Sequence, residues 1–175
     1  AIQRKRTDES IHRLLLGTAA VTGEQFFATM VEQLAKCLGT KYVMVGEILP
    51  ESPTKVSGLA FWNDKNLGEP VNYDLAETPC EKVSKNGFCL YENNIAELFP
   101  NDQALQELKA EFYAGILLRN TNGTPIGSLC AMHNAPLAAI AHVHEIFQIF
   151  SNRTSGEIER QRTEKALALA KDAAE

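Results

Sequence analysis

The sequence is poor in cysteine and in aromatic residues. Its 175 residues include four cysteines, and phenylalanine, tyrosine and tryptophan together make up 7% of the chain. Four cysteines are too few for a fold that is held together by disulfides. Glycine and proline, with 11 and 7 residues, are too scarce for a collagen-like or low-complexity chain, and 45% apolar residues are typical of a globular protein. At this length we expect one compact domain.

The sequence also lacks a hydrophobic run that could cross a membrane. The longest apolar-rich stretch, residues 137–150, is interrupted by two histidines, a glutamate and a glutamine, whereas a bilayer requires about 20 apolar residues. The basic start, Arg4 to Arg6, leads into polar residues and not into the apolar core of a secretion signal. We therefore expect a cytoplasmic chain with reduced thiols and no direct membrane insertion.

An excess of positive charge is absent as well. The formal net charge is −5, and residues 14–150 hold eight basic against fifteen acidic residues. A nucleic-acid backbone would be repelled by this part of the chain, because binding to phosphates depends on clustered lysine and arginine. The composition therefore argues against a nucleic-acid partner.

Two helices are predicted before the first strand. Residues 1–20 have apolar positions at helical spacing and contain one helix breaker, Gly17, so we expect an N-terminal linker helix there. Thr22, followed three positions later by Gln25, has the form of a capping box. Apolar residues then recur with a period of about 3.6 residues until Gly39, which predicts a second, amphipathic helix.

The middle of the chain is predicted to be rich in strands. Six segments combine β-branched and aromatic residues with flanking turn residues: 41–49, 55–62, 71–75, 87–91, 111–119 and 125–133. Asn122 and Gly123 are the strongest hairpin signal in the chain, so the last two strands should pair antiparallel. A helix is predicted over residues 101–109, after Pro100.

A long helix is predicted at the C-terminal end. From Leu137 to Glu175 the only breaker is Gly156, so this helix could reach ~58 Å at 1.5 Å per residue. Its first half is apolar enough for a buried face, whereas residues 151–165 hold Ile158 as their only large apolar residue. We expect the second half to project into solvent or to pair weakly with a second copy.

These elements predict an α+β fold in three parts. The N-terminal linker helix spans residues 1–20, the globular domain spans 21–150, and the C-terminal linker spans 151–175. We therefore expect the chain to be a piece of a longer protein, with helices that connect it to neighbouring domains.

Cys80 is the cysteine with the most favourable position for chemistry. Thr78 can cap a short helix that begins at Pro79, and Glu81 completes a capping box; this helix should run to about Asn86. A thiolate at the second position of such a helix is favoured by the helix dipole and by free N–H groups, which lowers its pKa. Cys80 is therefore a candidate reactive thiol.

Cys89 follows Cys80 by nine residues, so the two thiols are candidates for a redox pair. Both also have an ordinary alternative role as small buried core residues, which is common for free cysteines. The spacing of the four cysteines matches no zinc motif, because CxxC and CxH are absent.

Several segments resemble the GAF domain, a sensor module of signalling proteins. The most specific is GILLRNTNGTPIGSLCAMHNAPL, residues 115–137, which is similar to the family's pattern of strand, Asn-Gly turn, second strand and last helix. Three further segments resemble the sub-group found in bacterial sensor histidine kinases: GEQFFATMVEQLAKCLGTKYVMVGEI, TPCEKV and IAELFPND. The end of the chain, EIERQRTEKALALAKDAAE, is similar to linkers that lead into histidine kinase domains or cyclase output domains.

The resemblance implies an antiparallel sheet of about six strands, with the terminal helices on one face and a ligand pocket on the other. We expect candidate ligand contacts among the cysteines, the aromatic residues and one histidine of the middle segments. They are Trp62, Cys80, Phe88, Cys89, Phe112, Tyr113, Cys130 and His133. Tyr73 and Tyr91 are further aromatic candidates, and each aromatic residue has plain core packing as its alternative role.

The resemblance also bears on cofactors. Some members attach a bilin through a cysteine, usually followed by histidine, in the segment before the penultimate strand, and residues 101–109 contain neither. The Asn-Lys-Phe-Asp-Glu motif of members that bind cyclic nucleotides is absent too. We expect no bilin at the usual place, no haem and no metal, and the ligand stays unknown.

The function implied is regulatory sensing of a small ligand or of redox state, without catalysis in this part of the chain. The signal would pass through paired terminal helices of a homodimer to the output domain of a bacterial signalling protein, with a sensor histidine kinase as the expected parent. Two alternatives stay open: a stand-alone thiol reductase similar to free methionine sulfoxide reductase, and a ligand-free dimerisation spacer.

Overall fold

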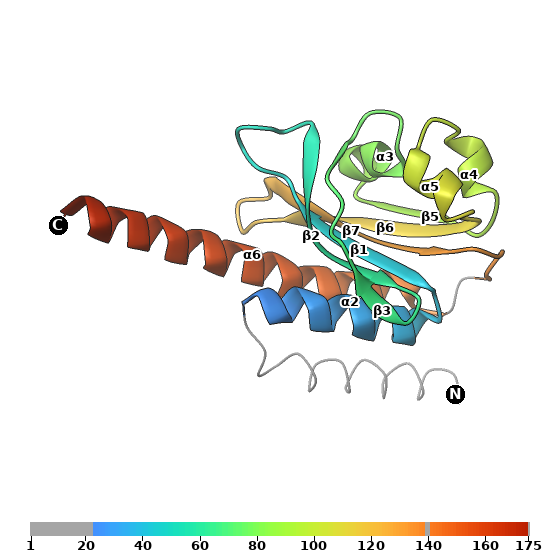
Figure 1. Cartoon of the computed structure of the whole chain (residues 1–175), viewed down its shortest axis with the longest axis horizontal. Helices are drawn as coiled ribbons and strands as arrows, with labels where there is room; N and C mark the ends of the chain where they lie inside the picture. The colour runs from blue at the N-terminus through green and yellow to red at the C-terminus, as the bar shows by residue number, and fades with distance from the viewer. Residues whose placement is uncertain (1–22, 139–140, 175) are drawn as a thin grey trace.

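An antiparallel β-sheet with helices on both faces forms the centre of the protein (Figure 1). The structure is a computed structural model that describes residues 23–138 and 141–174; the helix expected over residues 1–20 lies outside them. The strands are β1 (Tyr42–Glu47), β2 (Lys55–Asn63), β3 (Asn66–Gly68), β4 (Tyr73–Asp74), β5 (Phe88–Tyr91), β6 (Phe112–Arg119) and β7 (Pro125–His133). The helices are α2 (Glu24–Leu38), α3 (Pro79–Asn86), α4 (Ile95–Leu98), α5 (Gln103–Glu107) and α6 (Val143–Ala174).

The strand order is β3-β2-β1-β7-β6-β5, and β4 pairs with one end of β2. Each of the six predicted strand segments contains an observed strand, and the α+β prediction is confirmed. The predicted hairpin joins β6 to β7, with Gly123 at a φ of 82°. The sequence did not indicate β3, which returns along β2 after a turn in which Asp64 has a φ of 62°, or the short helix α4.

Side chains on alternate strand positions build two separate cores. The helix-side core lies between the sheet and the pair α2 and α6, and strand residues such as Val43, Phe112 and Leu129 contribute to it. The opposite core lies between the sheet and α3, α4 and α5, and includes Met44 and Tyr113. Because successive strand residues point to opposite faces, the neighbours Phe112 and Tyr113 belong to different cores.

Helix α2 follows the predicted period and ends as predicted, at Gly39 with a φ of 72°. Its N-terminus differs from the prediction, because the N-cap residue is Gly23 and not Thr22, which lies outside the described residues. No side chain of the helix itself caps it. The Gly23 N–H instead donates to Glu157 Oε1 of α6 at 2.8 Å, so a distant helix satisfies one of the free N–H groups that every helix start exposes.

Helix α6 begins at Val143, six residues later than predicted, directly after His142 with a φ of 65°. Its buried face continues beyond residue 150 to Ile158. Four polar contacts then attach it to the body: Glu157 to the Gly23 N–H, Glu159 Oε1 to the Thr121 N–H at 3.0 Å, Arg162 Nε to Glu47 Oε2 at 2.7 Å, and a second Arg162 nitrogen to the Ile48 carbonyl at 2.9 Å. The division predicted between residues 150 and 151 therefore falls inside the packed part of the helix.

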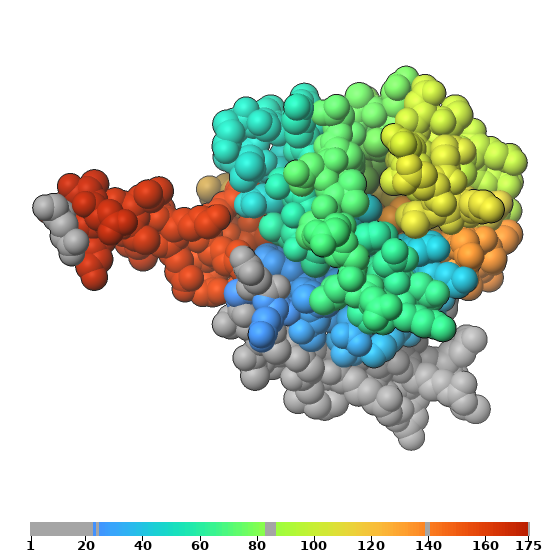
Figure 2. All heavy atoms as spheres, viewed as in Figure 1, coloured from blue at the N-terminus to red at the C-terminus, as the bar shows by residue number. Residues whose placement is uncertain are grey.

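The last third of α6 extends beyond the body, as Figure 2 shows. Every residue from Thr163 to Ala174 is exposed, including Leu167 and Leu169 with exposed fractions of 65% and 70%. The predicted projection is confirmed, and it begins at residue 163 instead of 151. Within the described ranges, none of the helices has the length and apolar content needed to span a bilayer.

Candidate functional site

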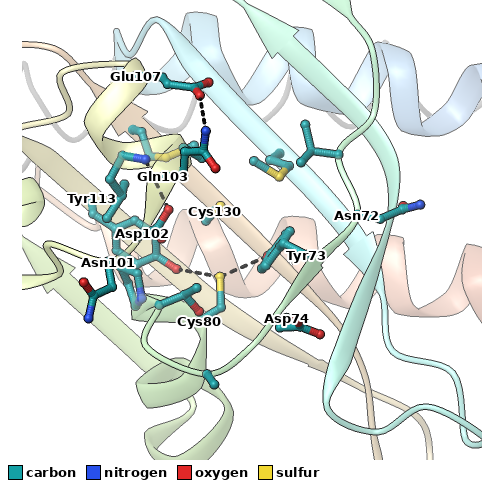
Figure 3. Close-up of a pocket in the computed structure, with 18 residues that line it drawn as sticks. Asn72, Tyr73, Asp74, Cys80, Asn101, Asp102, Gln103, Glu107, Tyr113 and Cys130 are labelled. Carbon is teal, nitrogen blue, oxygen red and sulfur yellow. Dashed lines mark hydrogen bonds between the residues drawn. The ribbon is translucent and has the colours of Figure 1, made fainter.

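A cavity of about 570 Å³ lies on the sheet face opposite α2 and α6. Its walls come from the segment around β4, the start of α3, helix α5 and the sheet itself (Figure 3). The polar side chains that line it are Asn72, Tyr73, Asp74, Thr78, Asn101, Asp102, Gln103 and Glu107. Apolar atoms of Met44, Val71, Leu105 and Met132 line it as well.

Strand register places Cys130 and Tyr113 on the cavity floor. Cys130 of β7 lies opposite Met44 on one side and Gly115 on the other, and Tyr113 lies opposite Met132. All of these positions face the same side of the sheet, because residues opposite one another across a ladder share a face. Ser128, two residues before Cys130, faces this side for the same reason.

The Cys80 sulfur is the convergence point of several polar groups. The hydroxyl of Tyr73 lies 3.1 Å from it and the hydroxyl of Tyr113 lies 3.4 Å from it. The Ser128 hydroxyl donates to the same sulfur at 3.8 Å. Figure 3 shows the sulfur between the two tyrosines, which reach it from β4 and from β6. The Cys80 residue is 5% exposed, so these contacts are made away from bulk water.

These contacts favour a thiolate at Cys80. Hydrogen bonds from Cys130, then from Tyr113, Tyr73 and Ser128, lower the pKa of Cys80 to about 6 against the opposing effect of burial. The same arrangement raises the pKa of Cys130, chiefly because Cys130 hydrogen-bonds to Cys80 and is itself buried. Burial followed by the negative charge of Cys80 raises the pKa of both tyrosines. Near neutral pH the pair therefore holds its negative charge on Cys80, while Cys130 and the tyrosines stay protonated.

The start of α3 differs in detail from the predicted capping box. The Thr78 hydroxyl donates to the Leu75 carbonyl at 2.7 Å and so does not act as the predicted cap acceptor. The Glu81 carboxylate reaches back to the Glu77 N–H at 3.0 Å, one residue earlier than in a standard box. The predicted helix is nevertheless present, with Cys80 as its second residue.

The charged groups around the cavity are all acidic. The described lining residues include the carboxylates Asp74, Asp102 and Glu107 and contain no lysine, arginine or histidine. Asp102 is the N-cap of α5, and its carboxylate accepts the Leu105 N–H at 3.2 Å. Burial nevertheless raises the pKa of Asp102, so the electrostatic environment here disfavours negative charge.

Three of the eight predicted contact residues line this cavity: Cys80, Tyr113 and Cys130. Trp62, Phe88 and Phe112 lie elsewhere, because they belong to the helix-side core or pack against it. Phe88, for example, stacks on His144 and contacts Phe147 of α6. These three residues occupy the alternate strand positions, whose side chains point away from the cavity.

Cys89 and His133 lie outside the cavity lining as well. Cys89 is half-buried and packs against the cavity-side core, but the cysteine whose hydrogen bond does most to lower the pKa of Cys80 is Cys130. His133, at the end of β7, accepts the Lys41 N–H on Nδ1 at 3.2 Å. Burial and the nearby charge of Lys41 lower the pKa of His133, so this imidazole acts as a neutral link between β7 and the start of β1.

The predicted site residues do not include Ser128 or the polar residues at the start of α5. Ser128 carries no local signal, because only the strand alternation that it shares with Cys130 places it under Cys80. Asp102 could have been found as an N-cap, since aspartate is a preferred cap residue three positions before Leu105. Among the described residues, no group of three or more histidine, cysteine, aspartate or glutamate side chains is arranged to hold a metal ion.

No family model and no curated protein matches the sequence. Among solved structures, the GAF domain of an Acinetobacter phosphoenolpyruvate-protein phosphotransferase is similar with a TM-score of 0.72 and 15% identity, covering 91% of this chain and 97% of that chain.

Two similar structures hold or are named for a chromophore. The chromophore-binding domain of Stigmatella aurantiaca phytochrome P1 has a TM-score of 0.66 and 9% identity, covering 86% of this chain and 59% of that chain. A far-red absorbing protein with bound biliverdin IXa has a TM-score of 0.66 and 11% identity, covering 86% of this chain and 98% of that chain. The chain therefore has a GAF-like fold, as the resemblance implied.

Proposed function

We propose that this chain is a regulatory domain that senses a small molecule in a bacterial signalling protein, with a sensor histidine kinase as the parent. The observation that carries the proposal is the cavity of about 570 Å³ on one face of the sheet, opposite a helix that leaves the body. A GAF-like fold supports it, although a fold alone does not determine a function. The resemblance of residues 157–175 to kinase linkers supports the proposed parent.

The charge of the cavity restricts the class of ligand. Three carboxylates line it, with no basic side chain among the described lining residues, and Cys80 adds a fourth negative charge when it is ionised. An anionic ligand would have to approach these charges without a counter-ion, which is unfavourable at low dielectric. We therefore propose a neutral or cationic ligand that carries hydrogen-bond donors.

Two neighbouring residues of β6 would transmit the signal, because their side chains lie on opposite faces of the sheet. Tyr113 contacts the cavity, and its neighbour Phe112 is 2% exposed in the core shared with α6. A ligand that displaces the tyrosine would strain a strand on which α6 rests. We expect two arrangements of β6, each with its own position of α6. A ligand that binds one arrangement more tightly would shift the population toward the corresponding position of α6.

The proposed output is a change in a parallel homodimer formed by the terminal helices. The exposed end of α6, residues 163–174, offers Leu167 and Leu169 to a partner. Removing residues 163–175 should lower the dimer fraction in sedimentation equilibrium while the far-ultraviolet spectrum of the body is kept. An unchanged dimer would contradict helix pairing.

Ligand binding is tested by native mass spectrometry of gently purified protein. We expect a retained small molecule, and we expect Ala104→Phe, which fills the cavity from α5, to abolish its retention. Ala168→Phe, at an exposed alanine of α6, is the matched control and should retain it. Protein that carries no molecule in any preparation, and that no neutral or cationic metabolite stabilises against heat, would favour the spacer alternative.

The thiol reductase is the second candidate, and the hydroxyl groups around Cys80 are the observation that favours it. Turnover of free methionine sulfoxide with dithiothreitol as the reductant would support it. Binding of a ligand without turnover would support the sensor.

A further inference from the structure

We propose that Cys80 and Cys130 form a thiol pair that reacts with hydroperoxides, with Cys80 as the nucleophile and Cys130 as the resolving thiol. The proposal uses the cavity of the proposed function but does not depend on which ligand the cavity binds. It also replaces the pair suggested by the sequence, Cys80 and Cys89, by one that strand register and the contacts of the sulfur define.

The position of Cys80 combines access with activation. Its residue lines the cavity, so a small hydroperoxide that enters the cavity can reach the sulfur. Two tyrosine hydroxyls and one serine hydroxyl surround the same sulfur, and such donors stabilise the thiolate that performs the attack. Burial raises the pKa of Cys37, so that half-buried thiol of α2 lacks this activation.

The position of Cys130 suits a resolving thiol, which attacks the oxidised Cys80 sulfur. Cys130 lines the same cavity and projects from the same face of β7 as Ser128, whose hydroxyl contacts the Cys80 sulfur at 3.8 Å. Helix α3 packs across β7 at this point, which brings the two cysteines together although 50 positions separate them in the sequence. Cys130 also has the largest effect that lowers the pKa of Cys80, in agreement with the shared cavity wall and the shared strand face that place the two thiols near each other.

The chemistry balances in two steps. The Cys80 thiolate attacks the terminal oxygen of the hydroperoxide, so a sulfur–oxygen bond forms while the oxygen–oxygen bond breaks. The alkoxide that leaves takes a proton from water in the cavity or from the Tyr73 hydroxyl, which solvent then reprotonates. Cys80 is oxidised to the sulfenic acid, and the hydroperoxide is reduced to an alcohol.

In the second step the Cys130 sulfur attacks the Cys80 sulfur. A disulfide forms as the sulfur–oxygen bond breaks, and the hydroxide that leaves combines with the Cys130 proton to give water. In sum, two thiols and one hydroperoxide yield a disulfide, an alcohol and water. No further oxidant is required.

The disulfide would change the cavity wall. Once the Cys80 sulfur is bonded to Cys130, it no longer carries the negative charge that accepts hydrogen bonds from Tyr73 and Tyr113. Two buried hydroxyls would then lose a strong acceptor, which is unfavourable unless they move. Tyr73 belongs to the two-residue strand β4, so we expect the segment around β4 to loosen when the pair is oxidised.

The test is hydrogen peroxide treatment of the complete chain at neutral pH, followed by intact mass and peptide mapping. We expect loss of the mass of two hydrogen atoms and a cross-linked peptide pair containing Cys80 and Cys130. Cys130→Ser should instead gain one oxygen atom and become reactive to dimedone, a probe for sulfenic acids. Cys37→Ser and Cys89→Ser are matched controls that should still form the disulfide.

Two kinds of result would overturn the proposal. One is a wild-type chain that keeps all its thiols while free cysteine in the same solution is oxidised. The other is a map that joins different cysteines or finds Cys80 oxidised without a disulfide. Wild-type mapping requires no substitution, so a variant that fails to fold cannot obscure the answer. Ligand retention in native mass spectrometry is a separate measurement, so failure of the sensor proposal can be told apart from failure of the thiol pair.

Discussion

The hydroxyl of Tyr113 lies over Gly115, two residues further along β6. A methyl group at Gly115 would come within 2.5 Å of the Tyr113 hydroxyl oxygen and 3.0 Å of two ring carbons. Both residues face the cavity, because side chains two positions apart on a strand share a face. The tyrosine ring can therefore lean along its own strand and reach Cys80 only because residue 115 has no side chain.

We predict that Gly115→Ala displaces the Tyr113 hydroxyl from Cys80. Loss of this donor should raise the pKa of the thiol and slow its alkylation by iodoacetamide near pH 6 by about fivefold for each pKa unit, since the thiolate fraction there falls from about one half to about one eleventh. Peptide mapping of the alkylated Cys80 measures the rate. Tyr113→Phe should slow it similarly without adding bulk, and an unchanged rate in both variants would contradict the assigned role of the hydroxyl.

Gly156→Ala is predicted to stabilise the protein. A Cβ atom at Gly156 would meet nothing within 4 Å, and the residue is an exposed position inside α6. Alanine should therefore raise the free energy of unfolding by about 0.5–1 kcal/mol, because glycine is a poor helix former. Urea denaturation measures the change, and a loss of stability would show that α6 is not a regular helix at this point.

The pKa of Cys80 should lie well below that of an ordinary thiol. The difference in thiolate ultraviolet absorbance between wild type and Cys80→Ser is expected to have its midpoint near pH 6, because hydrogen bonds lower the pKa of Cys80 to about 6. A pKa lower in the folded than in the unfolded chain means that ionisation stabilises the fold. This contribution is present above the ordinary thiol pKa of about 9, falls between about pH 9 and pH 6, and is absent below pH 6.

Glu157→Gln should weaken the connection between α6 and the start of α2. The buried carboxylate accepts the Gly23 N–H and contacts Arg160 at 2.6 Å, and we expect a loss of about 1–3 kcal/mol at neutral pH. Arg160 first, and then the Gly23 N–H, lower the pKa of Glu157. The stabilisation is therefore complete above the unfolded pKa of glutamate and disappears as the pH falls through the lower folded value.

The control for this variant is Glu164→Gln. Glu164 pairs with the same arginine, but its side chain is 63% exposed, whereas that of Glu157 is 8% exposed. Exposed pairs contribute little, so we expect a change within about 0.5 kcal/mol. Equal losses in the two variants would mean that Arg160, and not the bond to Gly23, is the important partner of Glu157.

Two truncations should differ sharply in stability. Ending the chain at Arg162 removes the exposed residues 163–174 together with residue 175, and should leave the free energy of unfolding nearly unchanged. Ending it at Phe150 removes Ile158, which is 2% exposed, together with the contacts of Glu157, and should cost about 3 kcal/mol or more. Thermal denaturation of both variants provides the comparison, and a stable chain ending at Phe150 would restore the predicted boundary between residues 150 and 151.

The end of α2 and the β6–β7 hairpin could be predicted, because one or two residues in the sequence specify each of them. The αL residue Gly39 ends α2, and the Asn122–Gly123 turn joins β6 to β7. The start of α6 was predicted too early, because Pro136 suits a first helical turn but no local signal places the break at His142. The packed part of α6 continues past residue 150 without a local signal, because Ser151, Thr154 and Ser155 are polar, yet they are buried against the body.

The residues of the candidate site could be predicted less completely than the helices and strands. The sequence by itself determined that Phe112 and Tyr113 face opposite sides of a strand, since the period of a strand is two residues. It also placed Cys80 at the start of a helix. Only the tertiary structure decided which side chains line the cavity, and that Cys130 and not Cys89 lines it together with Cys80. That arrangement forms where α3 crosses β7, and the position of a helix across a sheet is determined by the fit of many side chains at once, which no short stretch of sequence contains.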